Sequence, residues 1–109
     1  MLYELRVYTT FTGQLPNLLK KLETKTFPLW EKHGIKQVGF WTTLIGPDNN
    51  VLHYMLAWES LAEREQKWNA FQSDPDWIQA KADAVEEYGQ TNRQVNNIIL
   101  VPTKFSAMQ

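Results

Sequence analysis

The sequence predicts an α+β domain built on an antiparallel sheet, and its central stretch indicates this most clearly. Residues 35–59 contain two apolar runs on either side of a polar segment, Gly46 to Asn50. The runs are rich in β-branched and aromatic residues, which pack well on a pleated surface. Apolar runs that flank such a turn are typical of a β-hairpin. Because Pro47 suits a longer turn, we expect a loop of about five residues.

Both strands of this hairpin are apolar on both faces. In the second strand, one face carries Leu52, Tyr54, Leu56 and Trp58, and the other carries Val51, His53, Met55 and Ala57. In the first strand, Val38 and Phe40 share one face, and Gly39 and Trp41 share the other. A sheet with two apolar faces must be covered on both.

The elements before the hairpin are a strand and a helix. We expect a strand over residues 2–9 that presents Tyr3, Leu5 and Val7 on one face and Glu4, Arg6 and Tyr8 on the other. From Gln14 to His33, apolar residues recur at the spacing of an amphipathic helix. Pro28 should kink or split this helix near Thr26, and Gly34 should end it.

Two helices and a strand are expected after the hairpin. Ser60 and Glu63 match a capping box, and the expected inner face of this helix is Leu61, Arg64 or Glu65, Trp68 and Phe71. Asp74 and Pro75 should start another helix that runs to about Tyr88. Its expected inner face is Ile78, Ala82 and Val85, with Trp77, Ala84 and Tyr88 beside it. The last strand should span residues 91–102.

The resulting order, β-α-β-β-α-α-β, is that of a ferredoxin-like fold with its helices on one face of the sheet. The other face carries an apolar patch that water would not tolerate. The simplest cover is a second copy of the sheet, related by a two-fold axis. We therefore expect a homodimeric α/β barrel, which could associate further, formed by residues 1–103, with residues 104–109 as a frayed tail.

Composition limits the classes of partner. A net charge of −1 without a basic cluster argues against nucleic acid. No apolar run approaches the roughly 20 residues of a membrane span. The absence of Cys excludes disulfides and thiol nucleophiles and fits a reducing compartment. We expect a cytoplasmic protein that does not bind membranes.

Several segments resemble one known family in their order and spacing. Residues 3–8 resemble the opening strand of NIPSNAP proteins, and residues 31–35, 38–42, 58–64 and 71–77 are similar to later blocks of that family. The resemblance implies the dimeric α/β-barrel superfamily, which also includes antibiotic-biosynthesis and haem-degrading monooxygenases. NIPSNAP proteins have no agreed reaction, so the resemblance implies a fold more than a function.

The candidate ligand-binding residues are Glu4, Arg6, Tyr8, Trp41, His53 and Tyr54. Glu4 and Arg6 share a strand face. They either form a structural ion pair, or Arg6 anchors an anionic oxygen of a ligand while Glu4 orients the guanidinium. His53 could act as a base, although a satisfied core histidine is the more ordinary interpretation. Aromatic residues, including Trp58, Trp68 and Trp77, could line an apolar pocket or simply form the core.

No metal site or cofactor is expected, because two histidines without Cys lack the usual ligand spacing. Two functions remain open. The first is binding of a small apolar or aromatic molecule, with cofactor-independent, monooxygenase-like chemistry as an extension. The alternative is a non-enzymatic interaction or scaffold module. Whether any reaction is catalysed stays open, although polar residues inside the sheet tilt the balance toward a pocket.

Overall fold

The computed structural model describes all residues, 1–109. Its elements are β1 (Leu2–Thr10), α1 (Leu15–Lys21), η1 (Leu22–Thr26), α2 (Phe27–His33), β2 (Lys36–Thr42), β3 (Val51–Trp58), α3 (Leu61–Gln72), α4 (Pro75–Tyr88) and β4 (Asn92–Leu100). The first three helical pieces form one bent helix, so the predicted β-α-β-β-α-α-β order is confirmed. No helix is long and apolar enough to cross a membrane.

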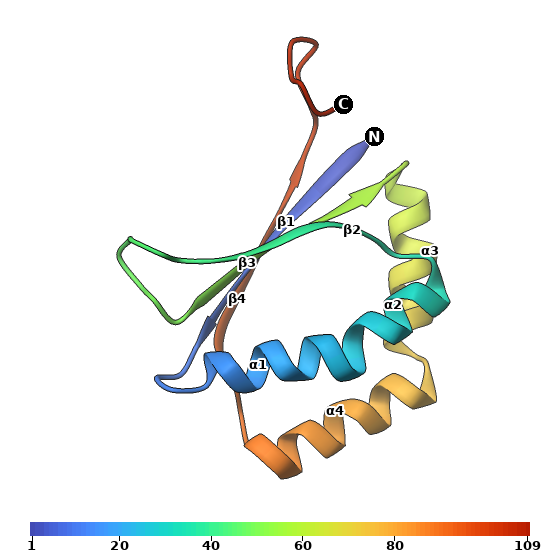
Figure 1. Ribbon diagram of the computed structural model, residues 1–109. Helices are drawn as coiled ribbons and strands as arrows, with labels where there is room; N and C mark the ends of the chain where they lie inside the picture. Colours follow the sequence, from blue (N-terminus) through green and yellow to red (C-terminus); the bar gives the residue numbers. More distant parts are fainter.

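The four strands form one antiparallel sheet in the order β2-β3-β1-β4. Helices lie on one side of this sheet, and the other side is bare (Figure 1). The arrangement confirms the predicted ferredoxin-like fold. Along β1, Glu4, Arg6 and Tyr8 face the helices, where their β3 partners are Leu56, Tyr54 and Leu52.

The bent helix follows the predicted kink closely. Residues 22–26 form a π-helical turn, and Pro28 occupies the first turn of the α2 piece that follows. Proline lacks an N–H and is tolerated there, whereas inside a continuous helix it would remove a hydrogen bond. Gly34 then adopts φ 70°, the left-handed conformation that ends α2.

The core lies between the sheet and the bent helix. Its fully buried side chains include Leu18 and Trp30 from the helix, Tyr54 and Trp58 from β3, and Phe71 from α3. Trp30 lies against Tyr54, with ring centroids 5.6 Å apart, and against Phe71 at 6.3 Å. Aromatic pairs at such separations contribute beyond their buried area.

The expected inner faces of α3 and α4 are partly wrong. Leu61 is 60% exposed, and Ile78 and Val85 are 53% and 62% exposed. In α4 the buried residues are Trp77, Ala80 and Ala84. The cause is that α4 packs beside η1 as well as α3. The buried residues of α4 thus include two alanines about one turn apart, Ala80 and Ala84, in place of the apolar stripe that periodicity favours.

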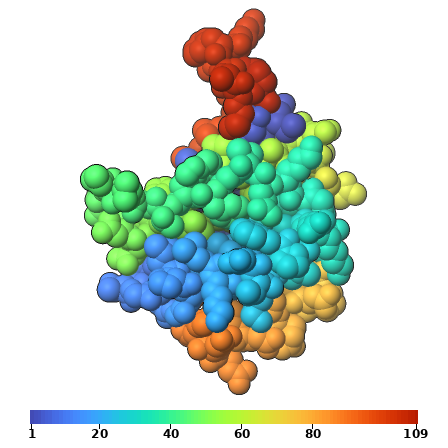
Figure 2. Space-filling model, in the orientation of Figure 1, coloured from blue at the N-terminus to red at the C-terminus, as the bar shows by residue number.

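The hairpin loop and the chain end protrude from the body of the molecule (Figure 2). Pairing of β2 with β3 ends at Thr42, so residues 43–50 form a longer loop than expected. Leu44 and Ile45 in this loop are 91% and 93% exposed. Strand β4 ends at Leu100, two residues earlier than expected. Beyond it, Tyr3 donates a hydrogen bond to the Gln109 carbonyl at 2.6 Å. Fraying of residues 104–109 stays a prediction.

Gly34→Ala should lower the free energy of unfolding by about 1–2 kcal/mol, because a Cβ is strained in the left-handed conformation. Gly34→Asn should recover most of this loss, since Asn tolerates that conformation. Urea titration of the three proteins measures the difference. Equal stability of Gly34→Ala and wild type would contradict the described end of α2.

Candidate functional site

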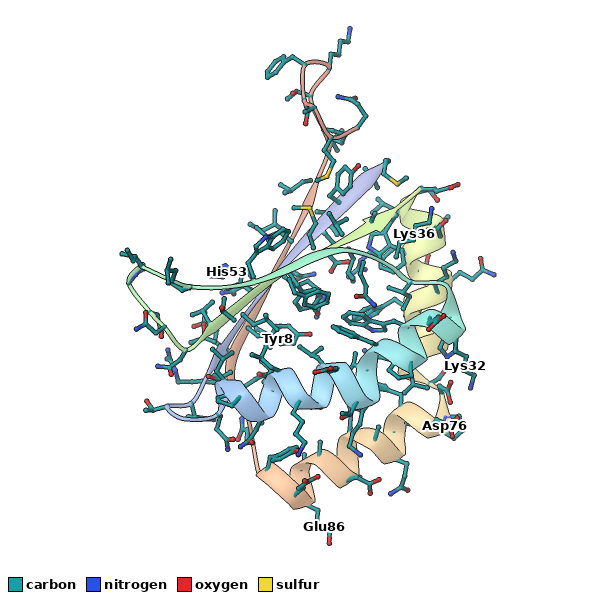
Figure 3. All side chains as sticks on the ribbon, in the orientation of Figure 1. Tyr8, Lys32, Lys36, His53, Asp76 and Glu86 are labelled. Carbon is teal, nitrogen blue, oxygen red and sulfur yellow. The ribbon has the colours of Figure 1, made fainter.

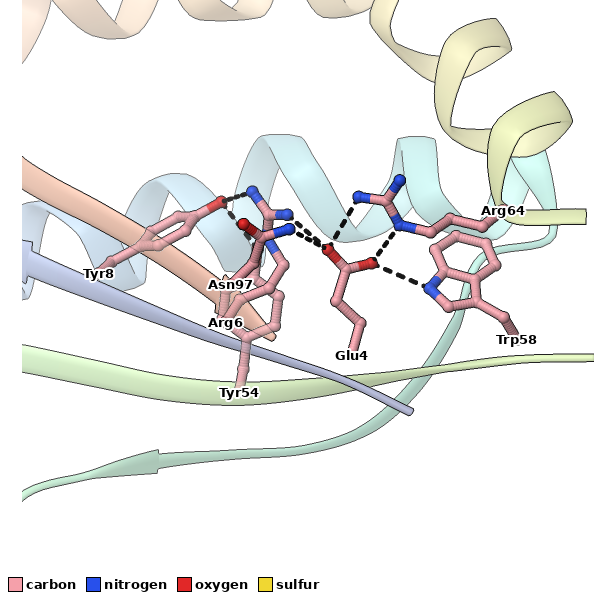
Figure 4. Close-up of polar contacts among 7 residues, drawn as sticks. All are labelled: Glu4, Arg6, Tyr8, Tyr54, Trp58, Arg64 and Asn97. Atoms are coloured by element: carbon pink, nitrogen blue, oxygen red, sulfur yellow. Dashed lines mark hydrogen bonds and ion pairs between the residues drawn. The ribbon is translucent and has the colours of Figure 1, made fainter. Parts of the chain in front are cut away.

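A fully buried carboxylate lies at the centre of the helix-covered face of the sheet. Glu4 has 0% exposure and accepts hydrogen bonds from five N–H groups, which belong to four residues of its own strand, β3, β4 and α3 (Figure 4). The donors are Arg6 Nη1 at 2.8 Å, Trp58 Nε1 at 3.0 Å, Arg64 Nε at 2.7 Å, Arg64 Nη2 at 3.0 Å and Asn97 Nδ2 at 3.0 Å. A buried charge is tolerated only with such partners.

Burial by itself would raise the pKa of Glu4. The hydrogen bonds from Arg64, Asn97, Arg6 and Trp58 outweigh burial and lower this pKa to about 2. Glu4 therefore stays ionised at neutral pH. It faces two arginines, so the three charged groups together carry one unit of positive charge.

Two tyrosine hydroxyls extend this network along the sheet. Arg6 Nε donates to the Tyr54 hydroxyl at 2.7 Å, and the Tyr54 hydroxyl donates to the Tyr8 hydroxyl at 2.7 Å. Arg6 Nη2 lies 3.3 Å from the same Tyr8 oxygen. Burial raises the pKa of Tyr54, and the neighbouring Tyr8 adds to this shift. Because the Tyr8 oxygen accepts these bonds, its own O–H stays available to a further acceptor.

A cavity of about 210 Å³ adjoins Arg6 and Tyr8 between the sheet and the helices. Its charged lining residues are Arg6, Lys21 and Lys81, its polar ones include Tyr8, Gln72 and Asn92, and its aromatic walls are Trp30, Trp68, Phe71 and Trp77. No carboxylate lines it. For comparison, a cavity of about 150 Å³ in another protein holds benzene.

Three buried polar atoms have no hydrogen-bond partner within the protein, and each belongs to a residue that lines this cavity. They are the indole Nε1 of Trp30, the indole Nε1 of Trp77 and Oδ1 of Asn92. Buried polar groups are nearly always satisfied, and an unsatisfied one costs free energy. Two donors and one acceptor without partners therefore belong to residues that line one cavity.

The six predicted site residues do not form one group. Glu4, Arg6, Tyr8 and Tyr54 lie together on the helix side. Trp41 and His53 pair with each other across β2 and β3 on the bare face (Figure 3 shows Tyr8 and His53 on opposite sides of the sheet). Their place follows from strand alternation, because His53 and Tyr54 are consecutive and must point in opposite directions. Trp41 therefore does not share a pocket with Tyr54.

Neither histidine lines the cavity described above. His53 Nε2 lies 3.1 Å from the Thr43 hydroxyl, and His33 Nε2 lies 2.7 Å from Asp74 Oδ2. Asp74 also pairs with Lys32 and caps α4 through the amide of Asp76. No group of three His, Asp or Glu side chains is arranged to hold a metal ion.

The lysines that line the cavity are not among the residues predicted from the sequence. Lys21 and Lys81 line the cavity. Lysines on amphipathic helices ordinarily lie in solvent, so residue type alone does not predict that these two belong to a site. A signal existed for Lys21, because it follows Leu18 by three positions and precedes Leu22, both of which are buried. Lys81 has no comparable signal, because periodicity predicts Ile78 and Val85 as buried residues of α4, whereas the buried ones are Trp77, Ala80 and Ala84.

Glu4→Gln should lower the free energy of unfolding at pH 7 by roughly 3–5 kcal/mol, because two partly buried arginines lose their anion. The difference from wild type should shrink as the pH falls from 4.5 toward 2. The pKa of Glu4 is lowered from 4.5 to about 2 in the folded protein, so its contribution is complete above 4.5 and is lost on acidification.

Urea titrations at several pH values measure this effect, with Glu65→Gln as the control at an exposed carboxylate on the same helix as Arg64. A Glu4→Gln protein as stable as Glu65→Gln at pH 7 would contradict the network described here.

Comparison with known proteins gives a consistent assignment. The NIPSNAP family profile matches residues 3–107. No curated protein matches the chain. A NIPSNAP family protein of unknown function from Agrobacterium tumefaciens is 27% identical in sequence, with a TM-score of 0.85 over 100% of this chain and 94% of that one. An uncharacterised NIPSNAP domain protein from Burkholderia xenovorans is 23% identical, with a TM-score of 0.84 over 97% and 98%.

The fold is also shared more distantly. A putative antibiotic biosynthesis monooxygenase from Nitrosomonas europaea is 9% identical, with a TM-score of 0.63 over 94% of this chain and 98% of that one. At this identity the likeness concerns the fold alone. The profile match over nearly the whole chain, together with the NIPSNAP structures of the same fold, shows that this chain belongs to the NIPSNAP family.

Proposed function

We propose that this NIPSNAP protein binds a small apolar or aromatic molecule in the cavity between the sheet and the helices. The observation that carries the proposal is the convergence of Trp30 Nε1, Trp77 Nε1 and Asn92 Oδ1, all buried and unpartnered, on one cavity. A cavity with mostly apolar walls and a few convergent polar groups is typical of small-molecule sites.

The polar floor of the cavity supports this function. Arg6 has five N–H groups and uses three of them on Glu4, Tyr8 and Tyr54. Its guanidinium is held over the Trp68 ring, 4.8 Å from the centroid. The remaining N–H groups and the Tyr8 O–H could hold an enolate or phenolate oxygen. Cofactor-independent, monooxygenase-like chemistry on such a compound is the reaction we propose to test, because the fold neighbour from Nitrosomonas is described as a putative antibiotic biosynthesis monooxygenase.

We further propose that the protein works as a homodimer whose sheets pack face to face. The bare face carries Trp41, 51% exposed, and Ile98, 53% exposed. Strand β4 is exposed along both of its faces from Arg93 to Leu100. Exposed apolar residues on a sheet face that no helix covers favour an interaction site, and a second copy of the same sheet fits it by symmetry. The absence of Cys supports a cytoplasmic location.

Protein purified without added ligand should carry a small organic adduct in native mass spectrometry. Tyr8→Phe keeps the ring but loses the hydroxyl, so it should retain the adduct about fivefold less tightly. Tyr88→Phe, on α4 and outside the cavity lining, is the matched control. A bare protein that also takes up no aromatic compound would favour the scaffold module instead.

Ile98→Glu should convert the dimer into a folded monomer, because a charge would be buried in the proposed interface. Val85→Glu places the same charge at an exposed apolar residue of α4 and should leave the dimer intact. Analytical ultracentrifugation reads the mass of each protein. A monomeric wild type, or a dimeric Ile98→Glu protein, would contradict the proposed arrangement.

A further inference from the structure

Two lysines from different helices meet at the cavity without an anionic partner. Lys21 of α1 and Lys81 of α4 lie on the same indole ring, with Nζ atoms 5.4 Å and 5.7 Å from the Trp77 centroid. Neither forms an ion pair with a carboxylate of the chain, whereas Lys32 and Lys67 do. Bringing two like charges together costs free energy unless something else offsets it.

The unfavourable environment of these charges lowers the pKa of Lys21. Burial lowers the pKa of this lysine, and the positive charge of Lys81 lowers it further. A bound anion would reverse both effects. The arginine network does not supply one, because Glu4 is already outnumbered by Arg6 and Arg64.

The position of the lysine pair indicates how a ligand would lie. Lys81 is exposed and Lys21 is half-buried, so the pair stands at the rim of the cavity. The Arg6 side chain is only 11% exposed and marks the deep end. Between them stand the aromatic walls, among which Trp30 and Trp77 have unpartnered indole N–H donors.

We propose that the cavity takes an aromatic carboxylate, whose ring lies among the tryptophans and whose carboxylate lies between Lys21 and Lys81. The indole N–H groups then donate to the ligand, and Asn92 Oδ1 accepts from a hydroxyl or amino group on it. This inference rests on the small-molecule function proposed above. It restricts the ligand from small apolar or aromatic molecules in general to aromatic carboxylates.

Three probes that share a phenyl ring and differ in charge test the assignment: benzoate, benzamide and benzylamine. The indole N–H signals of ¹⁵N-labelled protein report where each probe binds. Benzoate should shift the signals of Trp30 and Trp77 saturably. The signal of Trp41 on the bare face should stay unchanged, as should that of Trp58, which donates to Glu4. Benzamide should bind at least tenfold more weakly than benzoate, and benzylamine should not bind.

Lys81→Met removes the charge at an exposed position, so the fold should be kept and benzoate affinity should fall about tenfold. Lys21→Met should likewise keep the fold and lower benzoate affinity about tenfold, because the unbranched Met side chain can pack on Trp77 as the aliphatic part of Lys21 does. Lys20→Met, next to it on α1 but outside the cavity lining, should bind benzoate like wild type.

The outcomes separate the two proposals. Equal binding of benzoate and benzamide at Trp30 and Trp77 would overturn the carboxylate assignment and leave the small-molecule site standing. A Lys81→Met protein with unchanged benzoate affinity would also overturn it. Failure of all three probes to shift either indole signal would count against both proposals.

Discussion

The buried charge of Glu4 is the constraint on which the arrangement of this molecule depends. A carboxylate without solvent must be surrounded by donors, and here the donors come from β1, β3, β4 and α3. Arg64 makes two of the contacts and ties α3 to the sheet. Asn97 ties the edge strand β4 to the same group. The network therefore specifies how α3 and β4 dock, at a cost that an apolar core would avoid.

The same network explains the charge of the adjoining cavity. One carboxylate shared by two arginines leaves an excess of positive charge beside the aromatic walls. Lys21 and Lys81 add to this excess from the opposite side. Arg6 is paired with Glu4, whereas Lys21 and Lys81 form no ion pair with a carboxylate of the chain. This excess of positive charge is the basis of the ligand class proposed above.

Much of the fold could be predicted from the sequence, because its signals are local. The hairpin around Pro47, the kink near Pro28, the end of α2 at Gly34 and the cap at Ser60 all follow from nearby residues. Strand alternation likewise placed Glu4 and Arg6 on one face. These features depend on neighbours within a few positions, and the structure confirms them.

The errors arise where tertiary packing decides. Helix α4 packs beside η1 as well as α3, and it buries Ala80 and Ala84 while Ile78 is exposed. The separation of Trp41 and His53 from Tyr54 has a different cause, because it follows from strand alternation, which residue type alone does not reveal. The lysines of the cavity could not be recognised, because their meeting on Trp77 requires α1 and α4 to be side by side.

A crystal structure of the purified protein would test the central claim most directly, namely that the space beside Arg6 and Tyr8 is a binding site. The account predicts an open cavity in which a bound compound or ordered water accepts hydrogen bonds from the indole N–H groups of Trp30 and Trp77. A closed cavity, with both indoles bonded to protein groups and side chains filling the space, would contradict it.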